Sequence, residues 1–185
     1  LPSRYCPSDT LEAQAAEIVA GHLPGYAQVE AIRAWIERHI EYRYGSSNAS
    51  TDATETLTNR AGVCRDYAHV GISLCRSLKI PARMVVGYLH RLDPMDLHAW
   101  FEAFVGGRWY TFDATQSEPR GGRVVLAYGR DAADEGHAVV GGGGGRVGWA
   151  GRVGDGEPAG GGECGRVEAA EIPPAGAGVD GRWRL

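Results

Sequence analysis

Residues 59–68 read Asn-Arg-Ala-Gly-Val-Cys-Arg-Asp-Tyr-Ala, and they join a loop to the start of a helix. Gly62 marks the loop, and Cys64 stands where an apolar pattern of helical spacing begins. The unpaired N–H groups at a helix N-terminus carry partial positive charge, which favours a thiolate over a thiol. Cys64 is therefore a candidate nucleophile, although a single cysteine at a helix start more often serves packing.

The helix that begins at Cys64 is predicted to cover residues 64–78 and to end before Pro81. Its apolar face carries Cys64, Tyr67, Ala68, Gly71, Ile72, Cys75 and Leu78. Cys75 shares this face but lies near the other end of the helix, so we interpret it as a core residue. Cys64 and Cys75 would stand roughly 16 Å apart along one helix, too far for a disulfide.

The upstream part of the chain is predicted to be helical. Asp9 or Thr10 can cap a first helix, whose apolar stripe is Leu11, Ala15, Ile18 and Val19. A second helix is predicted over residues 26–40. Tyr42 and Tyr44 alternate with polar neighbours and indicate a short strand. Residues 45–52 are predicted to form a polar loop, and residues 54–58 lead into the central stretch.

Beyond Pro81 the apolar period changes from helical to two, which indicates strands. The strands are predicted over residues 82–90, 97–105, 108–114 and 123–128. Gly106-Gly107 is typical of a tight hairpin turn between the second and third of them. A helix-rich half followed by an antiparallel meander predicts an α+β domain.

A nucleophilic cysteine needs a base that takes and returns a proton, and a group that orients that base. His98 opens the second predicted strand and Asp113 closes the third. An even loop at Gly106-Gly107 would make these two residues diagonal neighbours on one face of the sheet, about 7–8 Å apart at the backbone. An imidazole and a carboxylate can bridge that distance, whereas an odd loop would point them to opposite faces.

The two faces of the second strand differ in character. The core face carries Leu97, Ala99, Phe101, Ala103 and Val105. The opposite face carries His98 with Trp100, Glu102 and Phe104, which suits the floor of a partly covered cleft. Cys64, His98 and Asp113 are thus predicted to form a Cys-His-Asp triad. The backbone N–H of Cys64 is the expected oxyanion donor, and the alternatives for a side-chain donor are Tyr42, Tyr44 and Asn59.

Composition and charge narrow the range of partners. A formal net charge of −4 over 185 residues, without a basic run, argues against nucleic acid. No stretch approaches the apolar length of a membrane span, so no membrane partner is expected. The four cysteines show no CxxC pair and no disulfide-framework spacing, which favours a reducing, cytoplasmic location. The chain begins at Leu1 rather than Met, as a fragment or a processed product would.

Four stretches of the sequence together resemble one family. They are Gly62-Val63-Cys64-Arg65-Asp66-Tyr67-Ala68, Ile80-Pro81-Ala82-Arg83, His98-Ala99-Trp100-Phe101-Glu102 and Trp109-Tyr110-Thr111-Phe112-Asp113-Ala114-Thr115. Over residues 1–134 the chain resembles the transglutaminase-like superfamily, in its bacterial branch of papain-like cysteine enzymes. The resemblance implies that the cysteine helix packs on an antiparallel sheet. It also implies that Cys64 is the nucleophile, His98 the base and Asp113 the orienting carboxylate.

The chain departs from the pattern of that family at both ends. Bacterial relatives usually carry an N-terminal β-rich region, which is absent before Leu1, and they continue past residues 128–134 into another apolar strand. Here residues 135–185 form a Gly-rich, low-complexity tail that holds 17 of the 28 glycines and is predicted to be disordered or a linker.

We hypothesise that this tail is translated from a shifted reading frame in GC-rich DNA. An absence of any apolar strand pattern in the neighbouring frame would contradict this. Loss of the last strand would destabilise the sheet and open the cleft, with the triad intact.

The sequence therefore predicts a thiol-dependent enzyme that acts on a protein, a peptide or a small amide through an acyl-enzyme and needs no cofactor. Water as second substrate gives a peptidase or amidase, and an amine gives a transglutaminase; hydrolysis is at least as well supported. No acidic loop suggests the calcium dependence of animal relatives. One alternative is a non-catalytic binding domain with the same fold. Another is a metal site built from Cys64, His69, His90 and His98, of which only the first two have a metal-site spacing.

Overall fold

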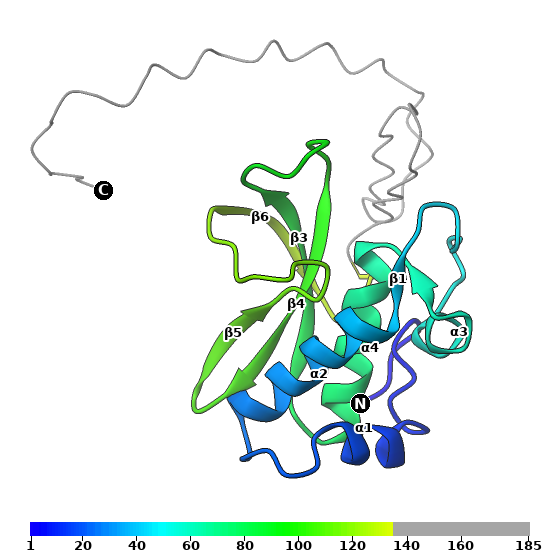
Figure 1. Cartoon of the computed structure of the whole chain (residues 1–185), viewed down its shortest axis with the longest axis vertical. Coiled ribbons are helices and arrows are strands. Elements are labelled where there is room, and N and C mark those ends of the chain that lie inside the picture. Colours follow the sequence, from blue (N-terminus) through cyan, green and yellow to red (C-terminus); the bar gives the residue numbers. More distant parts are fainter. Residues whose placement is uncertain (135–185) are drawn as a thin grey trace, which may run out of the picture. The chain divides into compact units, whose positions relative to one another are not determined.

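The computed structural model describes residues 1–134 and places a layer of helices against an antiparallel sheet (Figure 1). In chain order the elements are α1 (Glu12–Ile18), α2 (Tyr26–His39), β1 (Glu41–Tyr42), α3 (Ala53–Asn59), β2 (Ala61–Gly62), α4 (Cys64–Ser77), β3 (Ala82–Leu89), β4 (His98–Val105), β5 (Arg108–Phe112) and β6 (Arg123–Gly129). This is the predicted α+β fold. The tail proposed for residues 135–185 lies outside the described residues.

Helix α4 is the centre of the helical layer. It contacts α1, α2 and α3 on one side and strands β3 and β4 on the other (Figure 1). All but two of its fourteen residues are buried, and its apolar side chains join those of β3 and β4 in one core. The helix that begins at Cys64 is therefore held on all sides, which fixes the position of its first turn.

A glycine lets α4 approach the sheet closely. A methyl group added at Gly71 would lie 2.5 Å from Cε1 of Phe101 on β4. The Phe101 ring is fully buried and stacks on Phe112 at a centroid distance of 5.6 Å, so it has little freedom to move aside. The short distance between the helix that carries Cys64 and the strand that carries His98 depends on this glycine.

The first prediction concerns this contact. Overpacking a core costs about 1–3 kcal/mol, which exceeds the ~1 kcal/mol that alanine gains over glycine in a helix. We therefore expect Gly71→Ala to lower the free energy of unfolding by about 1–2 kcal/mol in urea titrations. Gly121→Ala is the matched control, because a methyl group there would meet nothing within 4 Å. Equal stability of the two variants would contradict the prediction.

The sheet has the strand order β5-β4-β3-β6, and each neighbouring pair is antiparallel. Gly106 and Gly107 have φ angles of 58° and 84°, as a tight two-residue hairpin requires. Val105 pairs with Arg108 and Phe101 with Phe112, so the loop is even. The predicted register is confirmed.

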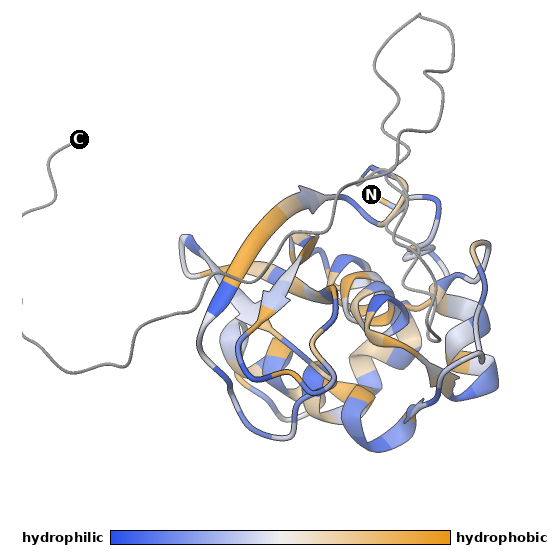
Figure 2. Ribbon diagram, turned by 90° about the horizontal axis from the view of Figure 1, so that it is seen from above, coloured by the Kyte–Doolittle hydropathy of each residue, from blue (hydrophilic) through white to orange (hydrophobic). Residues whose placement is uncertain are grey.

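The predicted meander is wrong for the last strand. β6 does not add to β5, but crosses to the other edge of the sheet and pairs with β3. Residues 113–122 provide an irregular connection that is long enough to make this crossing. β6 forms one edge of the sheet, and Figure 2 shows a hydrophobic stretch along its ribbon. The side chains of Val124, Val125 and Leu126 in this stretch are exposed.

One local prediction near the N-terminus also needs correction. Neither Asp9 nor Thr10 caps the first helix, because α1 starts at Glu12 after Leu11 and has no side-chain cap. The polar loop predicted over residues 45–52 is confirmed, and the segment after it, for which no helix was predicted, is the helix α3. Its threonines have low helix propensity, but the Asp52 carboxylate accepts a hydrogen bond from the Glu55 N–H at 2.9 Å and caps it.

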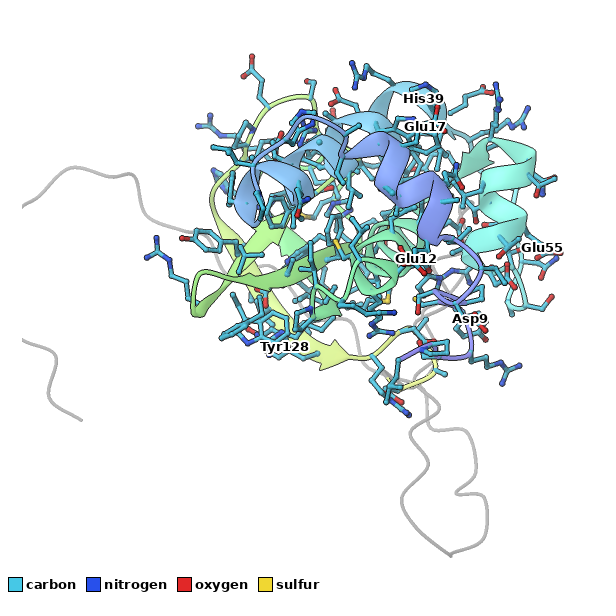
Figure 3. The ribbon with its side chains drawn as sticks, turned by 90° about the horizontal axis from the view of Figure 1, so that it is seen from below. Asp9, Glu12, Glu17, His39, Glu55 and Tyr128 are labelled. Carbon is cyan, nitrogen blue, oxygen red and sulfur yellow. The ribbon has the colours of Figure 1, made fainter. Side chains whose placement is uncertain are left out.

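The core face of β4 is as predicted, since its five apolar residues are all buried. On the opposite face of the sheet, Arg83 pairs with Glu102 at 2.7 Å and lies 4.2 Å from the ring centroid of Tyr128. Figure 3 shows Tyr128 on the other side of the molecule from His39 and Glu17, which belong to α2 and α1. Within residues 1–134, no helix combines the length and apolarity that a bilayer crossing requires.

Candidate active site

Cys64 is the first residue of α4, and the chain leading to it is fixed by the Asp66 carboxylate. Asp66 is fully buried and accepts a hydrogen bond from the Val63 N–H at 2.9 Å. The Ser47 hydroxyl donates to the same carboxylate at 2.5 Å, and the Arg65 guanidinium pairs with it at 2.8 Å. This network holds the helix start, and with it the thiol, in one orientation.

His98 and Asp113 meet on one face of the sheet. His98 is the first residue of β4, and Asp113 directly follows β5. His98 Nε2 lies 2.8 Å from Asp113 Oδ2, and each side chain is only 4% exposed. The diagonal pairing expected from the hairpin register therefore brings the imidazole and the carboxylate into direct contact.

The Asp113 carboxylate is held by donors on both oxygens. Oδ1 accepts hydrogen bonds from the Thr115 N–H at 3.1 Å and from the Thr115 hydroxyl at 2.7 Å. Oδ2 receives His98 and also lies 3.3 Å from Nη2 of Arg123. Burial raises the pKa of Asp113, but the bonds to His98 and Thr115 outweigh this and hold the pKa below its ordinary value. The carboxylate is thus ionised and fixed in rotation.

Cys64, the third residue of the predicted triad, lies against the His98 ring. Burial acts to lower the pKa of His98, whereas hydrogen bonds to Asp113 and to Cys64 raise it, with a net result of about 9. Because Nε2 is engaged by Asp113, Nδ1 is the ring nitrogen left to face the sulfur. The site can therefore hold a charged imidazolium between a thiol and a carboxylate at neutral pH.

The raised pKa of His98 predicts a pH dependence of stability. The pKa is above its ordinary value of 6.5, so the stabilisation is fully present below pH 6.5 and is lost as the pH rises through about 9. We expect the free energy of unfolding to fall by up to ~3 kcal/mol across this window. Urea titrations at several pH values measure it, with His98→Gln as the comparison. The prediction is wrong if this variant loses stability with pH as steeply as the wild type.

One of the three alternatives for a side-chain oxyanion donor lies next to Cys64. The parallel pairing of β1 with β2 puts Tyr42 opposite Gly62, two residues before Cys64, and the rings of Tyr42 and Tyr44 lie 5.5 Å apart. Burial, Cys64 and Tyr44 raise the pKa of Tyr42 well above its ordinary range, so its hydroxyl stays protonated and can donate. Asn59 is exposed at the end of α3.

A pocket of about 330 Å³ opens beside the histidine. Its wall is formed by Tyr42, Tyr44, Leu92, Asp93, Pro94, Asp96, Leu97, His98, Thr115 and Gln116. The cleft therefore lies at the end of β4, between β1 and the β3–β4 loop. The predicted cleft floor along the face of β4 is wrong, because Trp100 and Glu102 are buried there at 2% and 9% exposure.

The other cysteines of the described residues lie in the core. Cys6 and Cys75 are both fully buried, and burial raises the pKa of each thiol to about 12. The interpretation of Cys75 as a core residue is thus confirmed. All three cysteines of this part of the chain are free.

The four residues of the metal-site alternative are not gathered together. His69 stacks on Tyr5 in the interior at a centroid distance of 5.2 Å, and its Nε2 accepts a hydrogen bond from the Ala132 N–H at 3.3 Å. His90 is exposed. Among residues 1–134, no group of three or more His, Cys, Asp or Glu side chains could hold a metal ion.

Two neighbours of the site were not predicted from the sequence. The bond from the Thr115 N–H could have been predicted, because an aspartate carboxylate in a turn often accepts from the backbone N–H two residues further on. Arg123 gives no local signal, since only the crossing of β6 to the far edge of the sheet brings it to Asp113.

An α+β domain with a cysteine at a helix start, against a His–Asp pair on a sheet, is the arrangement of thiol enzymes. The model of the transglutaminase-like superfamily matches residues 12–114. The chain belongs to this superfamily, which includes cysteine proteases and transglutaminases.

The chain is also similar to individual proteins. A solved structure named "Putative Cysteine Protease from Cytophaga hutchinsonii" is 51% identical, has a TM-score of 0.71, and aligns with 76% of this chain and 47% of its own. An uncharacterized protein of Mycobacterium leprae is 33% identical over 143 residues, which are 72% of this chain and 50% of that protein. One of Mycobacterium tuberculosis is 32% identical over 146 residues, 69% of this chain and 46% of its own. The chain thus spans about half the length of these relatives.

Proposed function

We propose that this domain is a thiol-dependent enzyme that breaks or exchanges amide bonds through an acyl-enzyme. Cys64 is the nucleophile, His98 transfers protons, and Asp113 orients His98. The observation that carries the proposal is the 2.8 Å bond between His98 Nε2 and Asp113 Oδ2, which leaves the other ring nitrogen facing Cys64 at the start of α4. The family, whose members include cysteine proteases and transglutaminases, supports it.

In the first half of the reaction the Cys64 thiolate attacks the carbonyl carbon of the amide and forms a C–S bond. We assign the backbone N–H of Cys64 and the Tyr42 hydroxyl as donors to the developing oxyanion, since Tyr42 lies near Cys64 and stays protonated. The His98 imidazolium then gives its proton to the leaving nitrogen, the C–N bond breaks, and a free amine departs. The enzyme is left as a thioester with a neutral His98.

In the second half His98 takes a proton from the incoming nucleophile, which attacks the thioester carbon. Water gives a carboxylic acid, and an amine gives a new amide; in both cases the C–S bond breaks and the thiolate returns beside the imidazolium. The pocket beside Tyr42 and His98 is open to either nucleophile. We place hydrolysis of peptide or small amide bonds first, because the open site does not exclude water.

A screen of peptide, amide and amine substrates tests the proposal. We expect release of a fluorophore from peptide or anilide amides, and incorporation of a fluorescent amine if acyl transfer competes with water. Cys64→Ala is the control and should show neither activity. Equal turnover by this variant would contradict the proposal. Peptide binding without turnover by the wild type would favour a non-catalytic binding domain instead.

A further inference from the structure

Arg123 is the first residue of β6, and its guanidinium reaches the carboxylate of the candidate triad. Its Nη2 lies 3.3 Å from Asp113 Oδ2, the oxygen that also receives His98 Nε2. One carboxylate oxygen is thus shared between an imidazole and an arginine.

The guanidinium is held in a defined place. The Arg123 side chain is only 17% exposed, its Nη1 donates to the Arg120 carbonyl, and its Cζ lies 5.4 Å from the ring centroid of the buried Trp100. Among the described residues, Asp113 is the one acidic side chain that pairs with it. A largely buried cation needs such a partner, because burial of an unpaired charge is costly.

We propose that Arg123 is a positioning residue that acts through Asp113: it fixes the carboxylate and weakens its hold on the proton of His98. The proposal rests on the proposed function of the triad. A cation beside Asp113 competes for the lone pairs of Oδ2 and repels an imidazolium bound to the same oxygen. His98 consequently gives up its proton more readily to the leaving amine, and is more readily neutral when it must accept one from water.

Other titratable or charged groups face the pair and stay unchanged when Arg123 is replaced. Cys64 on α4 faces the His98 ring, and Tyr42 on β1 lies near Cys64. The β3–β4 loop adds Asp93 and Asp96. Behind Asp113, a second small pocket adds Glu30, Arg33, Glu118 and Arg120. A comparison of variants at Arg123 therefore isolates the contribution of this one cation.

The test is the titration of His98, followed by NMR of the imidazole protons and assigned with His98→Gln. In Arg123→Met we expect the midpoint to rise by about one pH unit, the size of effect that a charge at this range produces. The pH of the alkaline transition in kcat/KM should rise by a similar amount, while KM changes little. Arg123→Lys should restore a midpoint close to that of the wild type. Arg130 directly follows β6 and is exposed, so Arg130→Met removes the same charge and should leave the midpoint unchanged.

A purely structural Arg123 would lower stability and activity without moving the His98 midpoint, and that result would overturn the proposal. If Arg123→Met does not fold, Arg123→Gln removes the charge while keeping a polar head. The NMR titration does not depend on turnover. A shifted midpoint in an inactive protein would therefore keep this inference and reject the proposed function, whereas turnover with an unshifted midpoint would do the reverse.

Discussion

Iodoacetamide is expected to alkylate Cys64 at least ~100-fold faster than Cys6 or Cys75, and to do so well below pH 8. Solvent exposure cannot explain this difference in alkylation rate, since all three cysteines are at most 1% exposed. Burial raises the pKa of Cys6 and Cys75 to about 12, so they carry almost no thiolate. Cys64 alone of the three lies beside an imidazole, which can stabilise the thiolate by accepting its proton.

Mass spectrometry of the labelled peptides measures each rate, in a Cys164→Ser background that removes the remaining cysteine. His98→Ala should slow labelling of Cys64 and leave Cys6 unaffected. In substrate assays Cys64→Ala should lose activity by a factor on the order of 10⁴–10⁶, as nucleophile removal does in a comparable triad. Cys164→Ser should retain activity. Labelling of Cys6 as fast as Cys64 would rule out a thiol activated by its surroundings.

The pairing of His98 with Asp113 could be predicted from the sequence because it depends on local rules. Gly106-Gly107 determines an even hairpin loop, and the alternation of a strand then determines which side chains share a face. The start of α4 at Cys64 follows in the same way from helical spacing. Short-range periodicity was therefore sufficient to predict the contact of His98 with Asp113 and the position of Cys64 at the start of α4.

The remaining parts of the site depend on contacts that periodicity does not encode. α3 is stabilised by its Asp52 cap and by packing on α4, against the propensity of its threonines. The place of β6 beside β3 is a choice between two free sheet edges, and alternation along β6 is the same at either edge. Since Arg123 belongs to β6, its contact with Asp113 could not be predicted either.

Asp113→Asn is expected to lower kcat/KM by a factor on the order of 10³–10⁴, with little change in fold. The cause is a change in the tautomer of the His98 ring. Thr115 donates two hydrogen bonds to Oδ1, so the amide oxygen of an asparagine must occupy that place. Its NH₂ group then faces His98 Nε2 as a donor. Nε2 must lose its proton to accept this bond, which leaves the proton of a neutral ring on the nitrogen that faces Cys64.

Asp113→Ala separates the tautomer from the loss of charge. Alanine also removes the carboxylate, but it donates nothing to Nε2 and leaves His98 free to adopt the active tautomer. Asparagine should therefore be the more damaging change, although it resembles aspartate more closely in shape. Asp134→Asn, an exposed residue paired with Arg130, controls for the loss of one negative charge and should keep activity. If asparagine and alanine reduce kcat/KM equally, Asp113 acts through its charge alone; if neither reduces it beyond Asp134→Asn, Asp113 does not orient His98.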